Sequence, residues 1–450
     1  MRRSAILFLS IAAVGLAGCG SDGIDSVGDL NPFKPAETRL PGERRAVLPN
    51  GDPTLTATNR TAPVGAASAL GDWTQPGGNA SNDPGNVAFS GGGSRIWSVR
   101  AGQPGSAGSF GFGGSGLRVS ARPIIAGGQV IVYDPAGNVS AHSLSSGGRA
   151  WSTSLRPTGE DAVAAGGGVA AAGGRIFAAT GFSTVAALDQ ASGATLWTAQ
   201  LDSPARTAPA VAGGKVYVVT RTNGVIALDQ ASGAVAWTVE TAASSAGLLA
   251  SASPAVAGDT VVVPTSSGDI VGLSAADGAQ KWIFTVAGGS RTMAVAGLGD
   301  ASASPVVHDG VVYATGVGGR MVAARLATGE TIWEQPIGSA HTPVVSGGAV
   351  FLVDLDGRAV AFDRSNGTVL WQVALPRPAD ARRASTWAGP LLAGGRLWFV
   401  ANDGNMTTVD AATGQIGSTI SSGTAGAIAP VSASGTLVVL GADGTLSGFN

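Results

Sequence analysis

Residues 227–237 read Ala-Leu-Asp-Gln-Ala-Ser-Gly-Ala-Val-Ala-Trp, and residues 187–197 read Ala-Leu-Asp-Gln-Ala-Ser-Gly-Ala-Thr-Leu-Trp. Looser copies of this phrase end at Trp151, Trp282, Trp333 and Trp371. One further copy, at residues 410–418, ends on Ser418 in place of Trp. A phrase that returns about every 40–50 residues indicates a repeat architecture, in which each copy is one unit of supersecondary structure.

The residues around the first of these copies show what one repeat contains. Residues 209–219 hold two short apolar segments joined by Gly213-Gly214, which is typical of two strands and a tight turn. Asn223-Gly224 predicts a type I′ hairpin, because both central residues of that turn need a positive φ. The Asp-x-x-Ser-Gly of the phrase predicts a third turn, before the strand that ends on Trp. Four antiparallel strands per repeat are typical of one β-propeller blade.

Counting the first strands of the repeats gives the number of blades. They begin near Pro123, Val169, Pro209, Pro254, Pro305, Pro343, Pro390 and Pro430. The last repeat stops at Asn450 after three strands, whereas residues 94–99 look like a fourth strand with no repeat before it. Pairing the two would complete the eighth blade, close the ring and remove an exposed sheet edge. The sequence therefore predicts an all-β fold, an eight-bladed β-propeller of four-stranded antiparallel blades, over residues 72–450.

The repeated tryptophans are predicted to be structural. A large aromatic residue at equivalent positions of successive blades is expected to wedge between each blade and its neighbour. The set is Trp97, Trp151, Trp197, Trp237, Trp282, Trp333 and Trp371. A charged fraction of 12% and 70 glycines fit a turn-rich, tightly stacked β protein, but they do not select a function.

Residues 1–18 read as a secretory signal. Arg2-Arg3 precedes an apolar stretch, residues 6–14, that is too short to span a bilayer. The stretch ends in Leu16-Ala17-Gly18-Cys19, which resembles the lipobox of bacterial lipoproteins. That resemblance implies cleavage before Cys19 and lipidation of this residue. Because Cys19 is the only cysteine, the chain can form no internal disulfide and no cysteine-based metal cluster.

The resemblance to lipoproteins also implies where in the cell the protein is located. Several acyl chains on one residue give a stable membrane anchor, where a single chain gives a reversible one. Cys19 is followed by Gly20 and not by the Asp that inner-membrane lipoproteins usually carry, so we expect the periplasmic face of the outer membrane. Residues 19–71 are rich in proline and mixed charge and lack periodicity, which predicts a flexible linker between anchor and propeller.

Several kinds of chemistry find no support in the sequence. The formal net charge is −2 and no basic block exists, so nucleic acid is not an expected partner. Residues 111–116 match G-x-G-x-x-G but lack the strand-to-helix context of a dinucleotide site. The three histidines, at positions 142, 308 and 341, are scattered and are expected to be solvated or hydrogen-bonded. We predict no catalytic residue, no metal and no cofactor.

The repeat phrase resembles the tryptophan-docking motif of quinoprotein-like propellers, over nearly all of residues 72–450. One branch of that superfamily is the pyrroloquinoline-quinone alcohol dehydrogenases, which resemble one another in an adjacent Cys-Cys disulfide and in calcium-holding and catalytic carboxylates. This chain has a single cysteine. The lipobox, the eight blades and the length resemble the BamB family, propeller lipoproteins of the outer-membrane β-barrel assembly machinery.

The resemblance to BamB-type proteins implies a docking site. In that family two adjacent interblade loops grip the periplasmic domains of the barrel-inserting, BamA-like subunit, and residues 246–256 and 288–307 match those loops. Leu248 falls at a contact leucine and Asp300 at a contact aspartate, whereas Leu249 replaces an arginine and Ser302 an acidic residue. The implied partner-binding set is Leu248, Leu249, Arg291, Leu298 and Asp300. Ordinary interblade packing is the alternative role for the two adjacent leucines.

These features lead to an expected function. The resemblance implies a non-enzymatic scaffold lipoprotein that docks the barrel-inserting subunit and aids delivery of unfolded outer-membrane proteins. The alternative is a pyrroloquinoline-quinone-dependent dehydrogenase or a quinone-binding periplasmic protein. A binding module for cell-wall or other polysaccharides is a third hypothesis.

Overall fold

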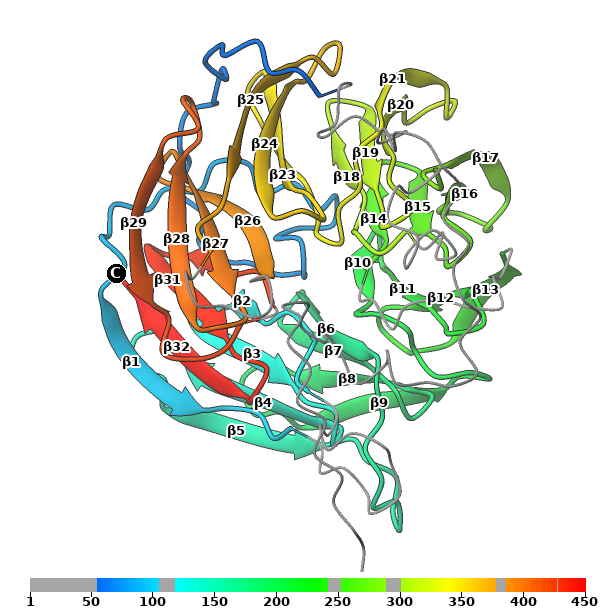
Figure 1. Cartoon of the computed structure of the whole chain (residues 1–450). Coiled ribbons are helices and arrows are strands. Elements are labelled where there is room, and N and C mark those ends of the chain that lie inside the picture. Colours follow the sequence, from blue (N-terminus) through cyan, green and yellow to red (C-terminus); the bar gives the residue numbers. More distant parts are fainter. Residues whose placement is uncertain (1–54, 105–117, 242–251, 289–300, 378–385, 427) are drawn as a thin grey trace, which may run out of the picture. The chain divides into compact units, whose positions relative to one another are not determined.

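The computed structural model describes residues 55–104, 118–241, 252–288, 301–377, 386–426 and 428–450. These residues belong to one compact unit, in which 32 strands form eight four-stranded sheets (Figure 1). No helix that could cross a membrane occurs in this part of the chain. The eight-bladed, all-β propeller predicted from the repeats is confirmed.

Blades 1 to 4 each consist of four consecutive antiparallel strands. Blade 1 has β2 (Ile124–Ala126), β3 (Gln129–Tyr133), β4 (Asn138–Ser143) and β5 (Arg149–Ser154). Blade 2 has β6 (Gly167–Ala172), β7 (Arg175–Thr180), β8 (Thr184–Asp189) and β9 (Thr195–Gln200). Blade 3 has β10 (Ala210–Ala212), β11 (Lys215–Val219), β12 (Gly224–Asp229) and β13 (Val235–Glu240). Blade 4 has β14 (Ala255–Ala257), β15 (Thr260–Pro264), β16 (Asp269–Ser274) and β17 (Gln280–Thr285).

Blades 5 to 7 repeat this order, and blade 8 departs from it. Blade 5 has β18 (Val306–His308), β19 (Val311–Thr315), β20 (Met321–Arg325) and β21 (Thr331–Gln335). Blade 6 has β22 (Val344–Ser346), β23 (Ala349–Val353), β24 (Arg358–Asp363) and β25 (Val369–Ala374). Blade 7 has β26 (Trp387–Ala393), β27 (Arg396–Ala401), β28 (Asn405–Asp410) and β29 (Ile416–Ser421). Blade 8 has β30 (Val431–Ala433), β31 (Thr436–Leu440), β32 (Thr445–Phe449) and, as its outer strand, β1 (Arg95–Arg100).

The ring is closed by strands from opposite ends of the chain. β1 pairs antiparallel with β32, and Trp97 lies opposite Gly448 in the register. The seam is extended by the C-terminal residue, since the carbonyl of Asn450 accepts hydrogen bonds from the amides of Gly93 at 2.8 Å and Ser94 at 3.0 Å. In blade 8, β32 and β31 are therefore paired on both sides, β30 faces the hub, and β1 forms the outer edge.

The repeated phrase forms a tight turn between the third and fourth strands of a blade. In blade 3 the Oδ1 atom of Asp229 accepts hydrogen bonds from the amide of Ser232 at 2.8 Å and from its hydroxyl at 2.7 Å. Gly233 then adopts a φ of 75°, a conformation in which a side chain would be strained. The same Asp-to-Ser or Asp-to-Thr bonds recur at Asp189 and Asp410.

Each repeat tryptophan is docked on the turn of the following blade. Its indole Nε1 donates to a turn carbonyl, as Trp197 does to Gln230 at 3.2 Å, and its ring covers the turn glycine. A Cβ atom on Gly233 would lie 2.6 Å from the Trp197 ring, so only glycine fits there. The other six indole bonds join Trp97 to Leu144, Trp151 to Gln190, Trp237 to Ala275, Trp282 to Leu326, Trp333 to Arg364 and Trp371 to Ala411.

The seam explains why Ser418 stands where a tryptophan is expected. A tryptophan at this position would dock on the turn of blade 8, but that turn is split between the C-terminus and the residues before β1. Gly93 occupies the place of the turn glycine, with a φ of 83°, and meets the side chains of Ile420 and Trp398 instead. Trp398 packs edge-on against Phe89, with ring centroids 5.5 Å apart. Blade 7 is thus fixed by Trp398 to the segment that leads into β1, the outer strand of blade 8.

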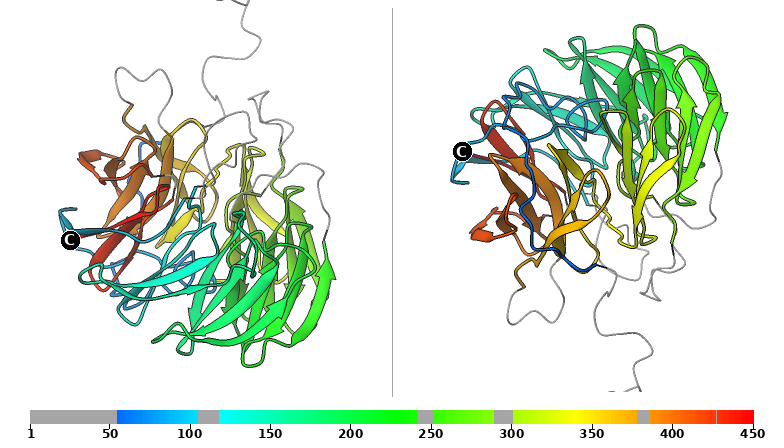
Figure 2. Two further views of the ribbon diagram at one scale, coloured as in Figure 1. Left: turned by 90° about the horizontal axis from the view of Figure 1, so that it is seen from below. Right: turned by 90° about the horizontal axis from the view of Figure 1, so that it is seen from above.

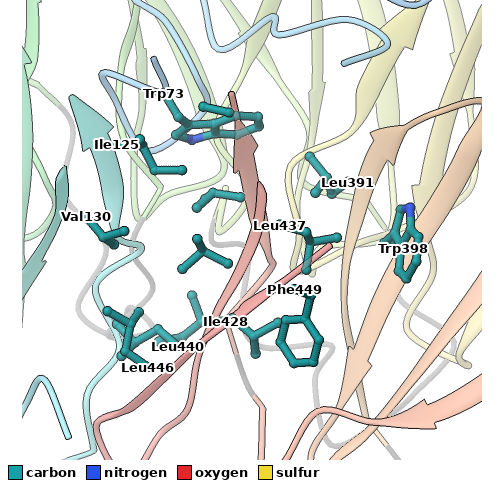
Figure 3. Packing of buried hydrophobic residues seen from close by; sticks show 14 of the residues in the cluster. Trp73, Ile125, Val130, Leu391, Trp398, Ile428, Leu437, Leu440, Leu446 and Phe449 are labelled. Carbon is teal, nitrogen blue, oxygen red and sulfur yellow. The ribbon is translucent and has the colours of Figure 1, made fainter. Parts of the chain in front are cut away.

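A buried cluster spans this closure and joins four parts of the chain (Figure 3). It holds Trp73 from the N-terminal segment, Ile125 from blade 1, Trp398 from blade 7, and Leu437 and Phe449 from blade 8. All five side chains are at most 2% exposed. The apolar area removed from water here stabilises the contact between the first and last blades.

The N-terminal segment is built into the propeller. Leu55 is 2% exposed, and the amides of Thr58 and Arg60 donate to the carbonyls of Val369 and Leu370 on β25 at 3.0 and 3.1 Å. Figure 2 shows this blue segment beside the yellow and orange strands of blades 6 and 7. The compact unit therefore begins before the predicted boundary at residue 72.

Residues 62–87, here called the cap segment, hydrogen-bond to all eight blades at the ends of their inner strands. The Gln75 side chain, for example, accepts from the Val211 amide at 3.2 Å and donates to its carbonyl at 2.7 Å. The remaining backbone bonds join Trp73 to Ile125, Thr74 to Ala171, Ala80 to Val256, Ser81 to Val307, Pro63 to Gly348, Val87 to Leu392 and Leu70 to Ser434. One end of the ring is therefore covered by a segment whose first ten residues, 62–71, belong to the predicted linker and whose remainder, 72–87, belongs to the predicted propeller.

Truncating a docking tryptophan should destabilise the ring. Trp237 is 8% exposed, so Trp237→Ala is expected to lower the free energy of unfolding by about 3–5 kcal/mol in denaturant titrations. Val235 lies on the same strand but is 59% exposed, and Val235→Ala should change that free energy by less than about 0.5 kcal/mol. Equal effects of the two substitutions would contradict the docking role of Trp237.

Removing a cap contact should also destabilise the propeller. Gln75→Ala leaves the amide and the carbonyl of Val211 buried without a partner, which should cost about 1–3 kcal/mol in the free energy of unfolding. Thr61 lies in the same part of the chain and is exposed, so Thr61→Ala serves as the matched control. Equal free energies of unfolding for Gln75→Ala and Thr61→Ala would contradict the role of this contact in holding the cap segment on the ring.

Candidate functional site

The interblade loops on one face of the ring are the candidate docking surface. In an antiparallel blade the fourth strand ends at the face where the next first strand begins, so all these loops emerge together. The two loops matched to the docking site connect β13 to β14 and β17 to β18. The implied contact residues Leu248, Leu249, Arg291, Leu298 and Asp300 lie outside the described residues, as does Cys19.

The described ends of these two loops are close together and firmly held. The amide of Ser253, at the end of the first loop, donates to the hydroxyl of Ser304, at the end of the second, at 2.9 Å. At its other end the first loop is held by Thr241, whose hydroxyl donates to the carbonyl of Asn223 at 2.7 Å. The second loop starts after Gly288, whose amide donates to the carbonyl of Gly318 at 3.0 Å. The two loops thus leave the ring as neighbours with fixed ends.

Ser302, which stands at an acidic position of the family pattern, is not placed for surface contact. The residue is 5% exposed, and its hydroxyl has no hydrogen-bond partner among the described residues. The Ser302 side chain is therefore not available for a surface contact.

A cavity of about 350 Å³ lies in the hub, between the starts of the inner strands. Pro76 of the cap segment contributes to its wall, whereas Ser253 and Ser304 come from the ends of the two loops. Its polar lining includes Arg118, Ser120, Arg122, His341 and Thr342. Because the cap segment covers the opposite ends of the inner strands, the cavity belongs to the face that carries the loops.

Arg122 is the central charged group of this cavity. Its Nε and Nη2 atoms donate to the carbonyls of Ala429 and Pro430 at 3.2 and 2.6 Å. The guanidinium carbon lies 5.1 Å from the centre of the Trp73 ring, within the range of a cation–π contact. Burial lowers the pKa of Arg122 to about 9, so the group remains a cation at neutral pH.

His341 faces the same cavity as a neutral group. Burial, and next the charge of Arg122, lower its pKa from 6.5 to about 4, although a hydrogen bond to the backbone of Trp387 opposes the shift. Sequence reasoning treated this residue as an unremarkable histidine and did not single out Arg122. The available signal was that Arg122 is a large charged residue directly before the first strand of a blade.

The other two histidines are held by hydrogen bonds, as the sequence analysis expected. His142 Nδ1 lies 3.1 Å from the carbonyl of Gly147 and Nε2 lies 3.1 Å from the Ser140 hydroxyl. His308 Nδ1 lies 2.6 Å from a carboxylate oxygen of Asp83, which ties the cap segment to blade 5. Burial raises the pKa of Asp83, against the lowering effect of its bond to His308.

The hub can be tested against the calcium and quinone chemistry of the superfamily's dehydrogenases. Its described lining residues include no aspartate or glutamate that could hold calcium or act as a base. More widely, the described part of the chain has no group of three or more His, Cys, Asp or Glu side chains placed to hold a metal ion. The donor set therefore does not fit a calcium–quinone centre.

Comparison with known families gives the affiliation of the chain. The model for outer membrane protein assembly factor BamB matches residues 135–373 and 355–450, which together cover more than half of the sequence. This chain belongs to the BamB family. The membership agrees with the resemblance inferred from the repeats and the lipobox-like sequence.

Solved structures share the fold of this BamB-family propeller. BamB from Moraxella catarrhalis has 23% identity and a TM-score of 0.64, with 79% of this chain and 99% of that chain covered. Quinohemoprotein alcohol dehydrogenase from Comamonas testosteroni has 16% identity and a TM-score of 0.64, with coverages of 85% and 81%. A europium-containing methanol dehydrogenase has 15% identity and a TM-score of 0.63, with coverages of 83% and 88%. Curated protein sequences give no significant match.

The half-buried, neutral His341 should make stability depend on pH. In the unfolded chain this imidazole takes up a proton below pH 6.5, whereas the folded protein keeps it neutral down to about 4. The contribution of the neutral imidazole to the free energy of unfolding is thus present above pH 6.5. It is lost as the pH falls, and the loss reaches about 3 kcal/mol at pH 4. Denaturant titrations at pH 7 and 4.5 should show a smaller loss for His341→Gln than for the unmodified protein. Equal losses in the two proteins would refute this assignment.

Proposed function

We propose that this BamB-family protein is a non-enzymatic scaffold of outer-membrane β-barrel assembly, which docks the barrel-inserting, BamA-like subunit through two adjacent interblade loops. The family match is the observation that carries the proposal. The Ser253–Ser304 hydrogen bond supports it, because it holds the ends of the two loops side by side. Loop ends that are already held in place lose no further conformational freedom on binding.

A second part of the proposed role is to aid delivery of unfolded outer-membrane proteins. Each blade ends in an outer strand whose edge is unpaired within its sheet, and on β13 only Trp237 is buried. Large apolar side chains are exposed on these strands, among them Ile96, Leu196, Val235, Ile283, Ile332 and Ile416. An extended client segment can pair with such an edge through backbone bonds, which provide affinity without sequence selectivity.

The proposed location follows from the N-terminal residues. Lipidation of Cys19 would anchor the protein at the periplasmic face of the outer membrane. Residues 20–53 would then connect the anchor to the compact unit that begins at Thr54.

Docking can be tested by charge changes at the two implied contact positions. Leu248→Asp combined with Asp300→Arg should reduce co-purification of the barrel-inserting subunit from envelope membranes by about tenfold or more, because both loops then present the wrong charge. Val235→Asp, on the exposed outer strand of blade 3, is the matched control. Unchanged recovery of the subunit with the double variant, in a protein that still unfolds at its normal temperature, would refute docking through these loops.

The dehydrogenase alternative has one observation in its favour, the shared fold of the two alcohol and methanol dehydrogenases. The hub lining opposes it, since its described residues supply no carboxylate. Adding pyrroloquinoline quinone and calcium to the purified protein should produce no alcohol-dependent dye reduction. Turnover in that assay would replace the scaffold proposal with an enzymatic one.

A further inference from the structure

The hub cavity concentrates positive charge in a protein with a formal net charge of −2. Two arginines, Arg118 and Arg122, line it, together with the hydroxyl residues Ser120 and Thr342. The described lining has no acidic side chain to balance them. A cavity of this composition is complementary to a negatively charged ligand.

Arg122 has unused hydrogen-bonding capacity inside this cavity. A guanidinium has five N–H groups. Two of them donate to the carbonyls of Ala429 and Pro430, which leaves three without a protein acceptor in the described part of the chain. No ion pair among the described residues includes Arg122. A largely enclosed cation without a counter-charge is costly, and the Trp73 ring compensates only part of that cost.

The position of Arg122 in the repeat leaves space around it. Arg122 directly precedes the proline that opens blade 1. The six other blades that open on a proline have a small residue at this position: Ala208, Ser253, Ser304, Thr342, Gly389 and Ala429. Among the blades that open on a proline, only blade 1 therefore has a long charged side chain at this position. The short side chains of the other blades leave space in the hub, and this space is the cavity.

We propose that the hub binds a small oxyanion of the carboxylate or phosphate class, held by the guanidinium of Arg122. The volume of about 350 Å³ equals that of about 12 water molecules, which is enough for an anion the size of citrate. The planar guanidinium matches two oxygens of a carboxylate or phosphate at once. The hydroxyls of Ser120 and Thr342 supply further donors from the same wall. This site is separate from the docking role and does not depend on it.

Binding can be measured by isothermal titration of the purified mature protein with citrate and, separately, with inorganic phosphate at pH 7. At least one of the two should bind saturably. Citrate alone would assign the site to carboxylates, and phosphate alone would assign it to phosphate groups. Heat that does not saturate with either anion up to millimolar concentrations overturns the proposal.

Three variants locate the site. Arg122→Gln should weaken binding by about tenfold or more, because it removes the charge-assisted bonds. Ala340→Phe should weaken it as well, by filling a wall position of the cavity without changing its charge. Arg149→Gln, which removes an exposed arginine on β5, should leave the affinity within about twofold. Equal binding by Arg122→Gln and the unmodified protein would place the anion elsewhere.

A spectroscopic measurement on the unmodified protein decides the case in which Arg122→Gln does not fold. A bound oxyanion offsets the charge of Arg122, one of the groups that depress the pKa of His341. The imidazole signals of His341 in NMR titrations should then move to a higher pKa when the anion is present. An unchanged His341 titration under saturating anion would overturn the assignment to the hub.

Discussion

The contact between a tryptophan of one blade and the glycine turn of the next is the interaction on which the propeller depends. Each blade is a small sheet with two apolar faces, and it is stable only when both faces are covered. The indole covers the turn, donates to its carbonyl and fixes the angle between neighbours, as Trp197 does over Gly233. Because the turn glycine cannot carry a Cβ under the ring, the two residues are required together, and the repeat phrase contains both.

That requirement explains how much of the fold the sequence could predict. The phrase and its spacing give the number of blades, and an incomplete last repeat with an orphan strand at 94–99 gives the closure. Even the exception follows from the same rule. Ser418 faces a turn that the chain ends divide between Gly93 and Asn450, so a tryptophan there would have no complete turn to dock on.

The cap segment and the hub could not be predicted in this way, for a physical reason. The contacts of the cap segment pass from blade to blade around the ring, so its sequence has neither the period of a strand nor that of a repeat. Gln75 hydrogen-bonds to the amide and the carbonyl of Val211, and the residues next to it in the sequence give no pattern that predicts this contact. Arg122 was detectable in principle, because aligning the repeats on their opening prolines sets it against small residues. The assignment of the docking residues is based on family resemblance alone.

Closure of one end of the ring by the cap segment has a consequence for recognition. Since the inner strands are covered at that end, access to the hub is left to the face that carries the interblade loops. Ser253 and Ser304 take part in both features, since they join the ends of the two loops and also line the cavity. A ligand in the hub would therefore contact residues that also hold the ends of the two loops. If binding in the hub or at the loops changes the position of these residues, thermodynamic linkage requires that each ligand affects the affinity of the other by the same factor.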